Sequence, residues 1–93
     1  MRKYLSVVVL LISFSSALSQ KISGVVIDEV TREPLIGVNV ILSNTNGTTT
    51  NIDGKFSLQI KENERTITFK YIGYESIVKN IDGKLEFNIM MKS

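Results

Sequence analysis

The chain has 93 residues, enough for a single domain, and contains no Cys, His or Trp. The absence of Cys and His excludes disulfides, the usual zinc ligand sets and the common catalytic triads. The 11 Lys and Arg residues, against 9 Asp and Glu, form no basic stripe with interleaved aromatic residues, so we expect no nucleic-acid partner.

Residues 1–19 show the three regions of a secretory signal peptide. Arg2 and Lys3 precede an apolar run, and small and polar residues follow that run up to Ser19. The apolar run has about half of the roughly 20 residues that span a bilayer, which disfavours a membrane anchor. We therefore predict export, cleavage between Ser19 and Gln20, and a mature domain of residues 20–93 without a transmembrane segment.

Removal of the leader changes the charge balance. Because Arg2 and Lys3 leave with it, nine basic and nine acidic residues remain, and the net charge of the mature domain is zero. No Cys follows Ser19, which disfavours a bacterial lipoprotein anchor. A small exported domain without disulfides depends on packing alone, and this fits a bacterial protein better than an animal one.

The mature chain begins with two predicted strands. Residues 22–28 form the first, with apolar residues on both faces, as in a strand that is covered on two sides or a strand of a small barrel-like sandwich. A polar connection ends at Pro34, which fits a sheet edge or the start of a strand. Residues 35–42 form the second strand, and Gly37 near its start indicates a bulge or a close approach by neighbouring backbone.

The next segment predicts a strand, a tight turn and a further strand. Asn46-Gly47 is a strong turn dipeptide. The β-branched residues 48–50 favour a strand, 51–54 have the composition of a turn, and 55–61 alternate strictly between apolar and polar residues. We interpret residues 47–60 as a hairpin whose second strand has one face buried.

Three further strands complete the chain. Residues 65–71 alternate, 72–74 form a kink around Gly73, and 74–80 form a less regular strand. Asp82-Gly83 indicates another hairpin turn before the last strand, 85–91.

Seven short strands with frequent turns predict an all-β, seven-stranded antiparallel β-sandwich, with a small closed barrel as the alternative. The predicted core includes Val38, Val40, Phe56, Leu58, Ile60, Ile67, Phe69, Phe87 and Ile89.

Four motifs in this order resemble a known family. They are SGVVID at 23–28, PLIGVNV at 34–40, GTTTNIDGKFSL at 47–58 and FKYIGYE at 69–75. Together they are similar to the carboxypeptidase-D regulatory-like domain, which has a transthyretin-like, immunoglobulin-like sandwich fold. The resemblance covers nearly all of the mature chain. Arg32 departs from it, because a turn glycine is frequent there, and we expect this to lengthen or reshape the loop.

In Gram-negative bacteria, similar domains follow the signal peptide of TonB-dependent outer-membrane transporters. The resemblance therefore implies a non-enzymatic interaction module that is periplasmic, outer-membrane associated or secreted, with an envelope or outer-membrane protein as its partner. The chain ends at Ser93, directly after the last predicted strand. We accordingly expect a free-standing module or the remnant of a longer transporter, without coupling box, plug or barrel.

The sequence contains no catalytic, cofactor or metal motif, and we predict that the protein is not an enzyme. Tyr71 and Tyr74 flank Gly73 and are the candidate ligand contacts. If exposed, they could stack on a sugar, which makes a carbohydrate-binding module the alternative function; packing at the sandwich edge is the simpler interpretation.

Other polar groups have simpler interpretations as turn or surface residues. Asn51-x-Asp53-Gly54 resembles part of a calcium loop but lacks the remaining ligands, so we interpret it as a turn. Asn46-Gly47-Thr48 matches a glycosylation acceptor and is likewise interpreted as a turn. The paired acids Glu29, Glu33 and Glu62, Glu64 predict solvated loops rather than a glycosidase pair.

Overall fold

The computed structural model of the protein describes residues 20–93, which form seven β-strands and no helix. The predicted signal peptide and Ser19 at the predicted cleavage site lie outside the described residues. The strands are β1 (Gln20–Asp28), β2 (Asn39–Ser43), β3 (Asn46–Thr49), β4 (Lys55–Ile60), β5 (Thr66–Lys70), β6 (Ile77–Asn80) and β7 (Glu86–Met91).

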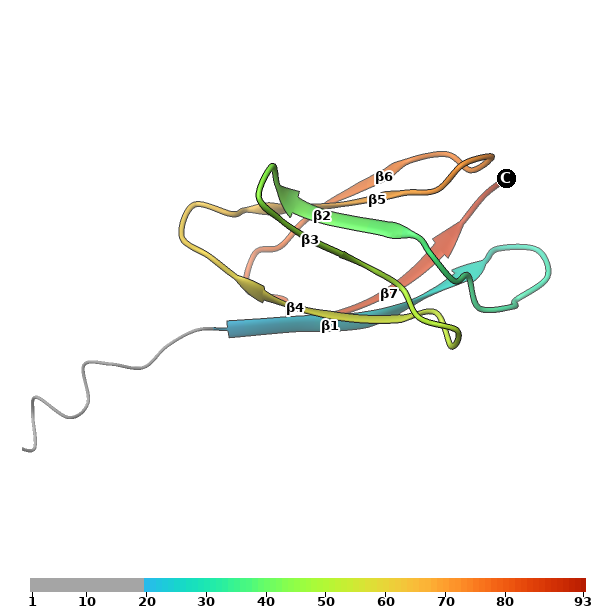
Figure 1. The fold of residues 1–93 in the computed structure, drawn as a ribbon, viewed down its shortest axis with the longest axis horizontal. Coiled ribbons are helices and arrows are strands. Elements are labelled where there is room, and N and C mark those ends of the chain that lie inside the picture. Colours follow the sequence, from blue (N-terminus) through green and yellow to red (C-terminus); the bar gives the residue numbers. More distant parts are fainter. Residues whose placement is uncertain (1–19) are drawn as a thin grey trace, which may run out of the picture.

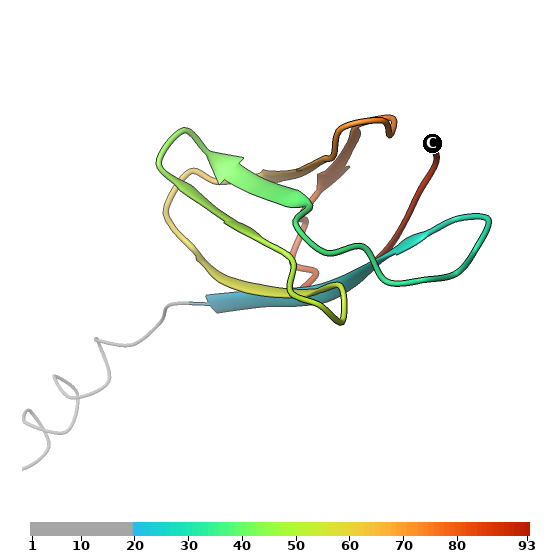
Figure 2. The same cartoon turned by 45° about the vertical axis from the view of Figure 1, so that its right-hand side comes forward.

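The strands form two separate sheets, one in the order β4-β1-β7 and one in the order β3-β2-β5-β6. Figures 1 and 2 show these sheets as two layers that face each other. The architecture is a β-sandwich, which confirms the predicted fold class over the alternative of a closed barrel.

One strand pair departs from the prediction that all strands are antiparallel. β1 pairs antiparallel with β4 but parallel with β7, in a register that places Ser23 opposite Glu86 and Asp28 opposite Met91. The physical reason is that the chain reaches β7 from β6, which belongs to the other sheet. A strand that arrives through such a crossover can enter its sheet parallel to its neighbour.

The two predicted hairpins at 51–54 and 82–83 are crossovers between the sheets. β3 lies in the four-stranded sheet and β4 in the three-stranded sheet, and the same change of sheet occurs between β6 and β7. The turns themselves are present where predicted. The hairpin prediction was wrong because a turn signal reverses the chain without specifying which strand becomes the hydrogen-bonded neighbour.

Two boundaries differ from the prediction around β2. This strand begins at Asn39, because Gly37 adopts φ 83° in a turn instead of forming a bulge; the register shift lies between Ile41 and Ser43. The following hairpin turn consists of residues 44–45, so Asn46 and Gly47 belong to β3.

The core lies between the two sheets. Eight of the nine predicted core residues are buried, and Ile60 is half-buried against them. Phe56 of one sheet and Phe69 of the other meet edge to face, with ring centroids 5.5 Å apart. The core also contains five residues that were not named individually: Ile22, Val26, Leu42, Ile81 and Met91.

The connections divide into two groups at opposite ends of the strands (Figure 1). We name the group formed by 29–38, 50–54 and 71–76 the Asp28 end, after the last residue of β1. We name the group formed by 44–45, 61–65 and 81–85 the Glu64 end. The chain terminus at Ser93 lies at the Asp28 end (Figure 1).

Candidate functional site

The predicted ligand contacts, Tyr71 and Tyr74, lie together at the Asp28 end. Gly73 takes φ 87° in the turn between them, and the Tyr74 N–H donates to the Tyr71 carbonyl at 3.0 Å. The two rings are tilted by 36° with centroids 5.5 Å apart. Both side chains are half-buried and pack against the core, so each presents only part of its ring to solvent.

The Tyr74 hydroxyl donates a hydrogen bond of 2.6 Å to Oδ2 of Asp28. The other carboxylate oxygen, Oδ1, accepts from the N–H groups of Val30 at 2.8 Å and Thr31 at 2.9 Å. Asp28 is buried at the end of β1. It therefore joins the connection 29–38 to the connection 71–76.

These contacts shift the pKa values of both partners. The bond from Tyr74, then those from Thr31 and Val30, hold the pKa of Asp28 below its ordinary value against the opposing effect of burial. The bond to the Asp28 carboxylate, with burial, raises the pKa of Tyr74. Sequence reasoning missed Asp28; its signal was an Asp directly before a turn, where its side chain can accept backbone N–H groups.

A second polar residue, Thr50, is buried at the same end. Its hydroxyl donates to the Leu35 carbonyl at 2.5 Å and accepts from the Val38 N–H at 2.9 Å. The Thr50 backbone adds a bond to each of Gly37 and Val38. This arrangement explains the spacing of two motifs, because a threonine of the third motif holds the irregular backbone of the second.

The turn at 51–54 is built by the side chain of Asn51. Its Oδ1 accepts from the N–H groups of Asp53 at 2.9 Å and Lys55 at 3.0 Å. A Cβ on Gly54 would lie 2.5 Å from the Val26 carbonyl oxygen, and φ at Gly54 is 73°, so this position requires glycine. The interpretation as a turn is therefore confirmed, since the Asn51 oxygen is occupied by backbone donors.

Arg32 adopts φ 67°, the left-handed conformation for which a turn commonly uses glycine. The Arg32 N–H donates to the Asp28 carbonyl at 2.9 Å. The turn thus keeps the backbone conformation that a glycine would allow. The departure from the family motif adds backbone strain at Arg32 and does not change the path of the chain there.

The Glu64 end contains a second carboxylate cluster. Glu64 accepts bonds from the Ser43 hydroxyl at 2.7 Å, the Asn46 amide at 2.9 Å and the Lys61 N–H at 2.7 Å. Partial burial disfavours the charged form, but the bonds from Lys61, Ser43 and Asn46 outweigh it and lower the pKa of Glu64. Glu64 therefore lies in a loop as predicted, but it is half-buried and bonded within the fold instead of solvated.

The remaining polar residues singled out in the sequence either bond within the fold or lie far from one another. The Asn46 amide also donates to the Gln59 carbonyl at 2.7 Å, so it connects β3 with β4 instead of lying in a loop. Glu29 and Glu33 are exposed at the Asp28 end, whereas Glu62 is exposed at the Glu64 end. The length of the strands separates the two acidic pairs.

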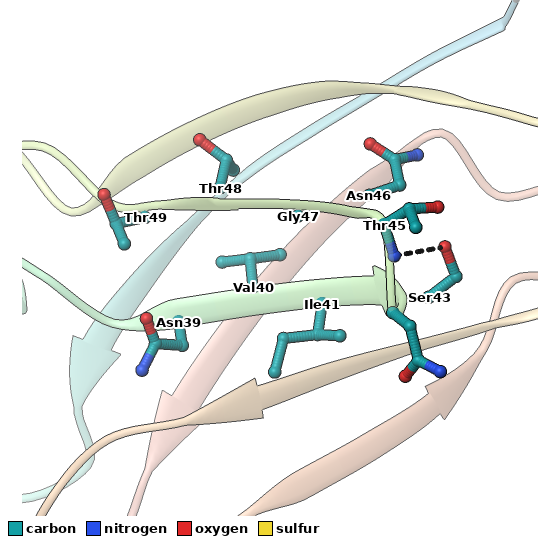
Figure 3. A pocket seen from close by; sticks show the side chains of 10 residues that line it. Asn39, Val40, Ile41, Ser43, Thr45, Asn46, Gly47, Thr48 and Thr49 are labelled. Atoms are coloured by element: carbon teal, nitrogen blue, oxygen red, sulfur yellow. Dashed lines mark hydrogen bonds between the residues drawn. The ribbon is translucent and has the colours of Figure 1, made fainter.

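A shallow hollow, open to solvent, lies over the β2–β3 hairpin (Figure 3). Its lining is polar and apolar in about equal parts, and in it the Ser43 hydroxyl accepts from the Thr45 N–H at 3.4 Å. Gly47 adds no side chain, so part of the wall is backbone. Neither tyrosine lines this hollow, and it offers hydrogen bonds to a polar ligand without an aromatic platform.

Residues 20–93 contain no cluster of three or more Cys, His, Asp or Glu side chains placed to hold a metal ion. Within the same residues, no helix is long and apolar enough to cross a membrane.

Two comparisons with known proteins agree with the motifs. The family model described as CarboxypepD_reg-like domain matches residues 22–93, which confirms the resemblance inferred from the sequence. TonB-dependent receptor P39 of Formosa agariphila is 34% identical over 61 residues. This alignment covers 64% of the chain but 6% of the receptor, so the chain spans a small part of that relative.

Proposed function

The chain belongs to the CarboxypepD_reg-like domain family, and from this membership we propose that it is an exported, non-enzymatic accessory module that contacts another protein of the cell envelope. The relationship to a TonB-dependent receptor supports an envelope location. In this proposal the chain acts like the N-terminal extension domain of a TonB-dependent transporter. It contacts a larger envelope protein and has no transport activity of its own.

One observation carries this proposal: four exposed aliphatic side chains project from the three connections at the Asp28 end. The exposed fractions are 97% for Ile72, 80% for Val30, 74% for Ile52 and 54% for Ile36. The two buried polar side chains of this end, by contrast, are used inside the fold, as the bonds of Asp28 and Thr50 show. Beside its exposed charged residues, this end therefore offers apolar contact to another molecule.

The possible gain from such contact is large enough to matter. Complete burial of an Ile or Val side chain stabilises by about 1.5–3 kcal/mol. Several such side chains on one end could therefore anchor a specific complex, since a few residues usually dominate the binding energy of an interface.

The test is capture of binding proteins from envelope extracts with the exported protein as bait, followed by mass spectrometry. We expect a defined envelope protein that is retained by the wild type and by Glu62→Ser, an exposed control at the opposite end. The double variant Ile52→Ser, Ile72→Ser should retain much less. Equal recovery of abundant proteins on all three baits would contradict the proposal.

A carbohydrate-binding module is the second candidate, favoured by the paired, partly exposed rings of Tyr71 and Tyr74. Tyr71→Ala is the informative variant, because Tyr74 also supports the fold through Asp28. Binding on a glycan array that this variant abolishes would support the second candidate. An array without binding would eliminate it.

A further inference from the structure

The two sheets have four edge strands, β3, β4, β6 and β7. The outward backbone groups of β4 are partly hydrogen-bonded within the domain, and β3 is short and lies beside β4. On β4, Lys55 exchanges hydrogen bonds with Asn51, and the Gln59 carbonyl accepts from the Asn46 side chain. Of the β4 residues whose backbone groups point outward, Ser57 alone has both its N–H and its carbonyl free of the bonds just described. The other edge on this flank, β3, has four residues and lies beside β4.

The opposite flank has the edges β6 and β7. On β6, the Ile81 N–H donates to Arg65 of the β5 side, so the odd-numbered residues face β5. On β6, the backbone N–H and carbonyl groups that point away from β5 are therefore those of Val78 and Asn80 only. Lys79 shares the core-facing side of the sheet with its partner Ile67 but is exposed, a device that discourages indiscriminate strand pairing.

β7 is the longest uncovered edge. The Ser23 N–H donates to the Leu85 carbonyl and the Glu29 N–H to the Met91 carbonyl, so the odd-numbered residues of this segment face β1. Backbone groups of Glu86, Asn88 and Met90 therefore point away from β1. The next even-numbered carbonyl, that of Lys92, accepts from the Glu75 N–H, which confirms the direction.

No strand of the described chain pairs with this side of β7. The edge is six residues long, without proline, and its alternation of buried and exposed side chains is regular. Figure 1 shows β7 beside β1, and the order β4-β1-β7 makes it an edge strand. An incoming strand could therefore bond to Glu86, Asn88 and Met90 in succession, as in other cases of strand addition.

We propose that the free edge of β7 binds an extended segment of another protein as an added strand, and that this segment carries an acidic residue among its inward-facing side chains. The proposal rests on the proposed function as a contact module and names the site and the chemistry of the contact.

The acidic preference follows from the charges on the inner side of this flank. Lys79 lies on the core-facing side of β6, and the Lys84 ammonium lies 5.4 Å from the centroid of the buried Phe87 ring. Glu86 alternates to the outer face of β7. Lys79 on β6 and Lys84 beside Phe87 of β7 thus place positive charge on both elements that flank an entering strand, which favours an acidic partner.

The same charges disfavour a second copy of this chain. The inward side chains of β7 are Phe87, Ile89 and Met91, none of which is acidic. A second β7 added to the edge would leave Lys79 and Lys84 without a carboxylate. Apolar neighbours for the incoming segment are present, because Ile77 is half-buried and Leu85 is 40% exposed.

The experiment uses the exported protein and an acetylated, amidated heptapeptide, Thr-Val-Thr-Glu-Thr-Val-Thr. A matched peptide has lysine in place of the glutamate. In an amide NMR titration we expect shifts confined to β7 and β6, with the acidic peptide binding more tightly. Asn88→Pro should weaken that binding about tenfold, because it removes a free donor and disturbs its neighbours.

Two further variants control this result. Ser57→Pro places proline at the corresponding outward position of β4 and should leave binding unchanged. Lys79→Glu combined with Lys84→Glu keeps the backbone intact and should reverse the preference between the two peptides. This reversal tests the proposal even if a proline variant fails to fold.

Three results would overturn the proposal: no shifts on β7, equal binding of both peptides, or concentration-dependent dimerisation that Asn88→Pro abolishes, since a second copy would then occupy the edge. These results are independent of the envelope capture. Capture that depends on Ile52 and Ile72, without peptide binding to β7, would leave the accessory function standing and remove only this site.

Discussion

At the residue scale, Asp28 shows how a single buried carboxylate determines the structure of a loop region. It accepts bonds from the Tyr74 hydroxyl and from the N–H groups of Val30 and Thr31. The first bond attaches a distant connection, and the other two close the turn after β1. Tyr74 is accordingly part of the support of the Asp28 end as well as part of its surface.

This support predicts a pH dependence of stability. Because the pKa of Asp28 is lowered in the folded state, its contribution is complete above its unfolded pKa of about 3.9 and is lost as the pH falls through the lower folded value. Tyr74→Phe should lower the urea midpoint at neutral pH and lose less stability between neutral and acid pH than the wild type. Urea unfolding measured across this range checks the prediction.

The control is Tyr71→Phe, which leaves the bond to Asp28 in place. It should follow the wild-type pH profile. Glu64 also titrates in acid and is present in all three proteins, so the difference between the tyrosine variants isolates Asp28. Identical profiles for both variants would mean that the bond from Tyr74 contributes no measurable stability.

Arg32 provides a second prediction at this scale. Its φ of 67° is unfavourable for a residue with a Cβ. Arg32→Gly should raise the free energy of unfolding by up to about 1 kcal/mol, after the greater freedom of glycine in the unfolded chain is included. Thermal or urea unfolding measures the gain.

Asn63, with φ 71°, serves as the comparison for Arg32. Asparagine tolerates the left-handed conformation better, so Asn63→Gly should gain less. A loss of stability in Arg32→Gly would instead assign a stabilising role to the Arg32 side chain, whose guanidinium contacts Met90 Sδ at 3.0 Å.

At the element scale, the family motifs describe contacts between connections. Thr50 follows β3 and holds residues 35–38, which precede β2, through its hydroxyl and its backbone. Gly54 precedes β4 and packs closely against the backbone of β1. There the Val26 N–H donates to the Gly54 carbonyl at 2.8 Å, and the Val26 carbonyl leaves no room for a Cβ on Gly54. The motifs thus preserve the geometry of the Asp28 end.

Thr50→Val tests this role. The variant keeps the shape of the side chain but leaves the buried Val38 N–H without its hydroxyl acceptor, which should destabilise the fold by about 1–3 kcal/mol. Thr49→Val at the exposed neighbouring position should change stability by no more than about 0.5 kcal/mol. Equal urea midpoints for the two variants would contradict the importance of the Thr50 hydroxyl.

At the scale of the whole molecule, packing between the two sheets holds the domain together. Phe69 is completely buried and meets Phe56 across the interface between the sheets. A domain of this size without disulfides has a free energy of unfolding of about 3–5 kcal/mol. Loss of one large aromatic contact is therefore comparable to the whole stability.

Phe69→Ala should destabilise by about 3–5 kcal/mol and leave little folded protein. Circular dichroism during thermal unfolding measures this, with Ile72→Ala as the control because Ile72 is 97% exposed. A melting curve of Phe69→Ala near that of the wild type would show that the sheets are held together by other contacts.

Local alternation was sufficient to predict the strands and most of the core. In β4, Phe56 and Leu58 are buried between exposed polar residues, as their period of two requires. The turns at Asn51 and Asp82 were also predicted, because asparagine, aspartate and glycine favour the required backbone conformations. Each of these features depends on residues close together in the chain.

The tertiary structure alone decided which strands pair and which polar groups meet. The parallel pairing of β1 with β7, the crossover between β3 and β4, and the bond from Tyr74 to Asp28 all join residues that local patterns treat independently. The physical reason is that alternation determines which side of a strand faces the core, whereas its neighbour is selected by how both sheets pack together.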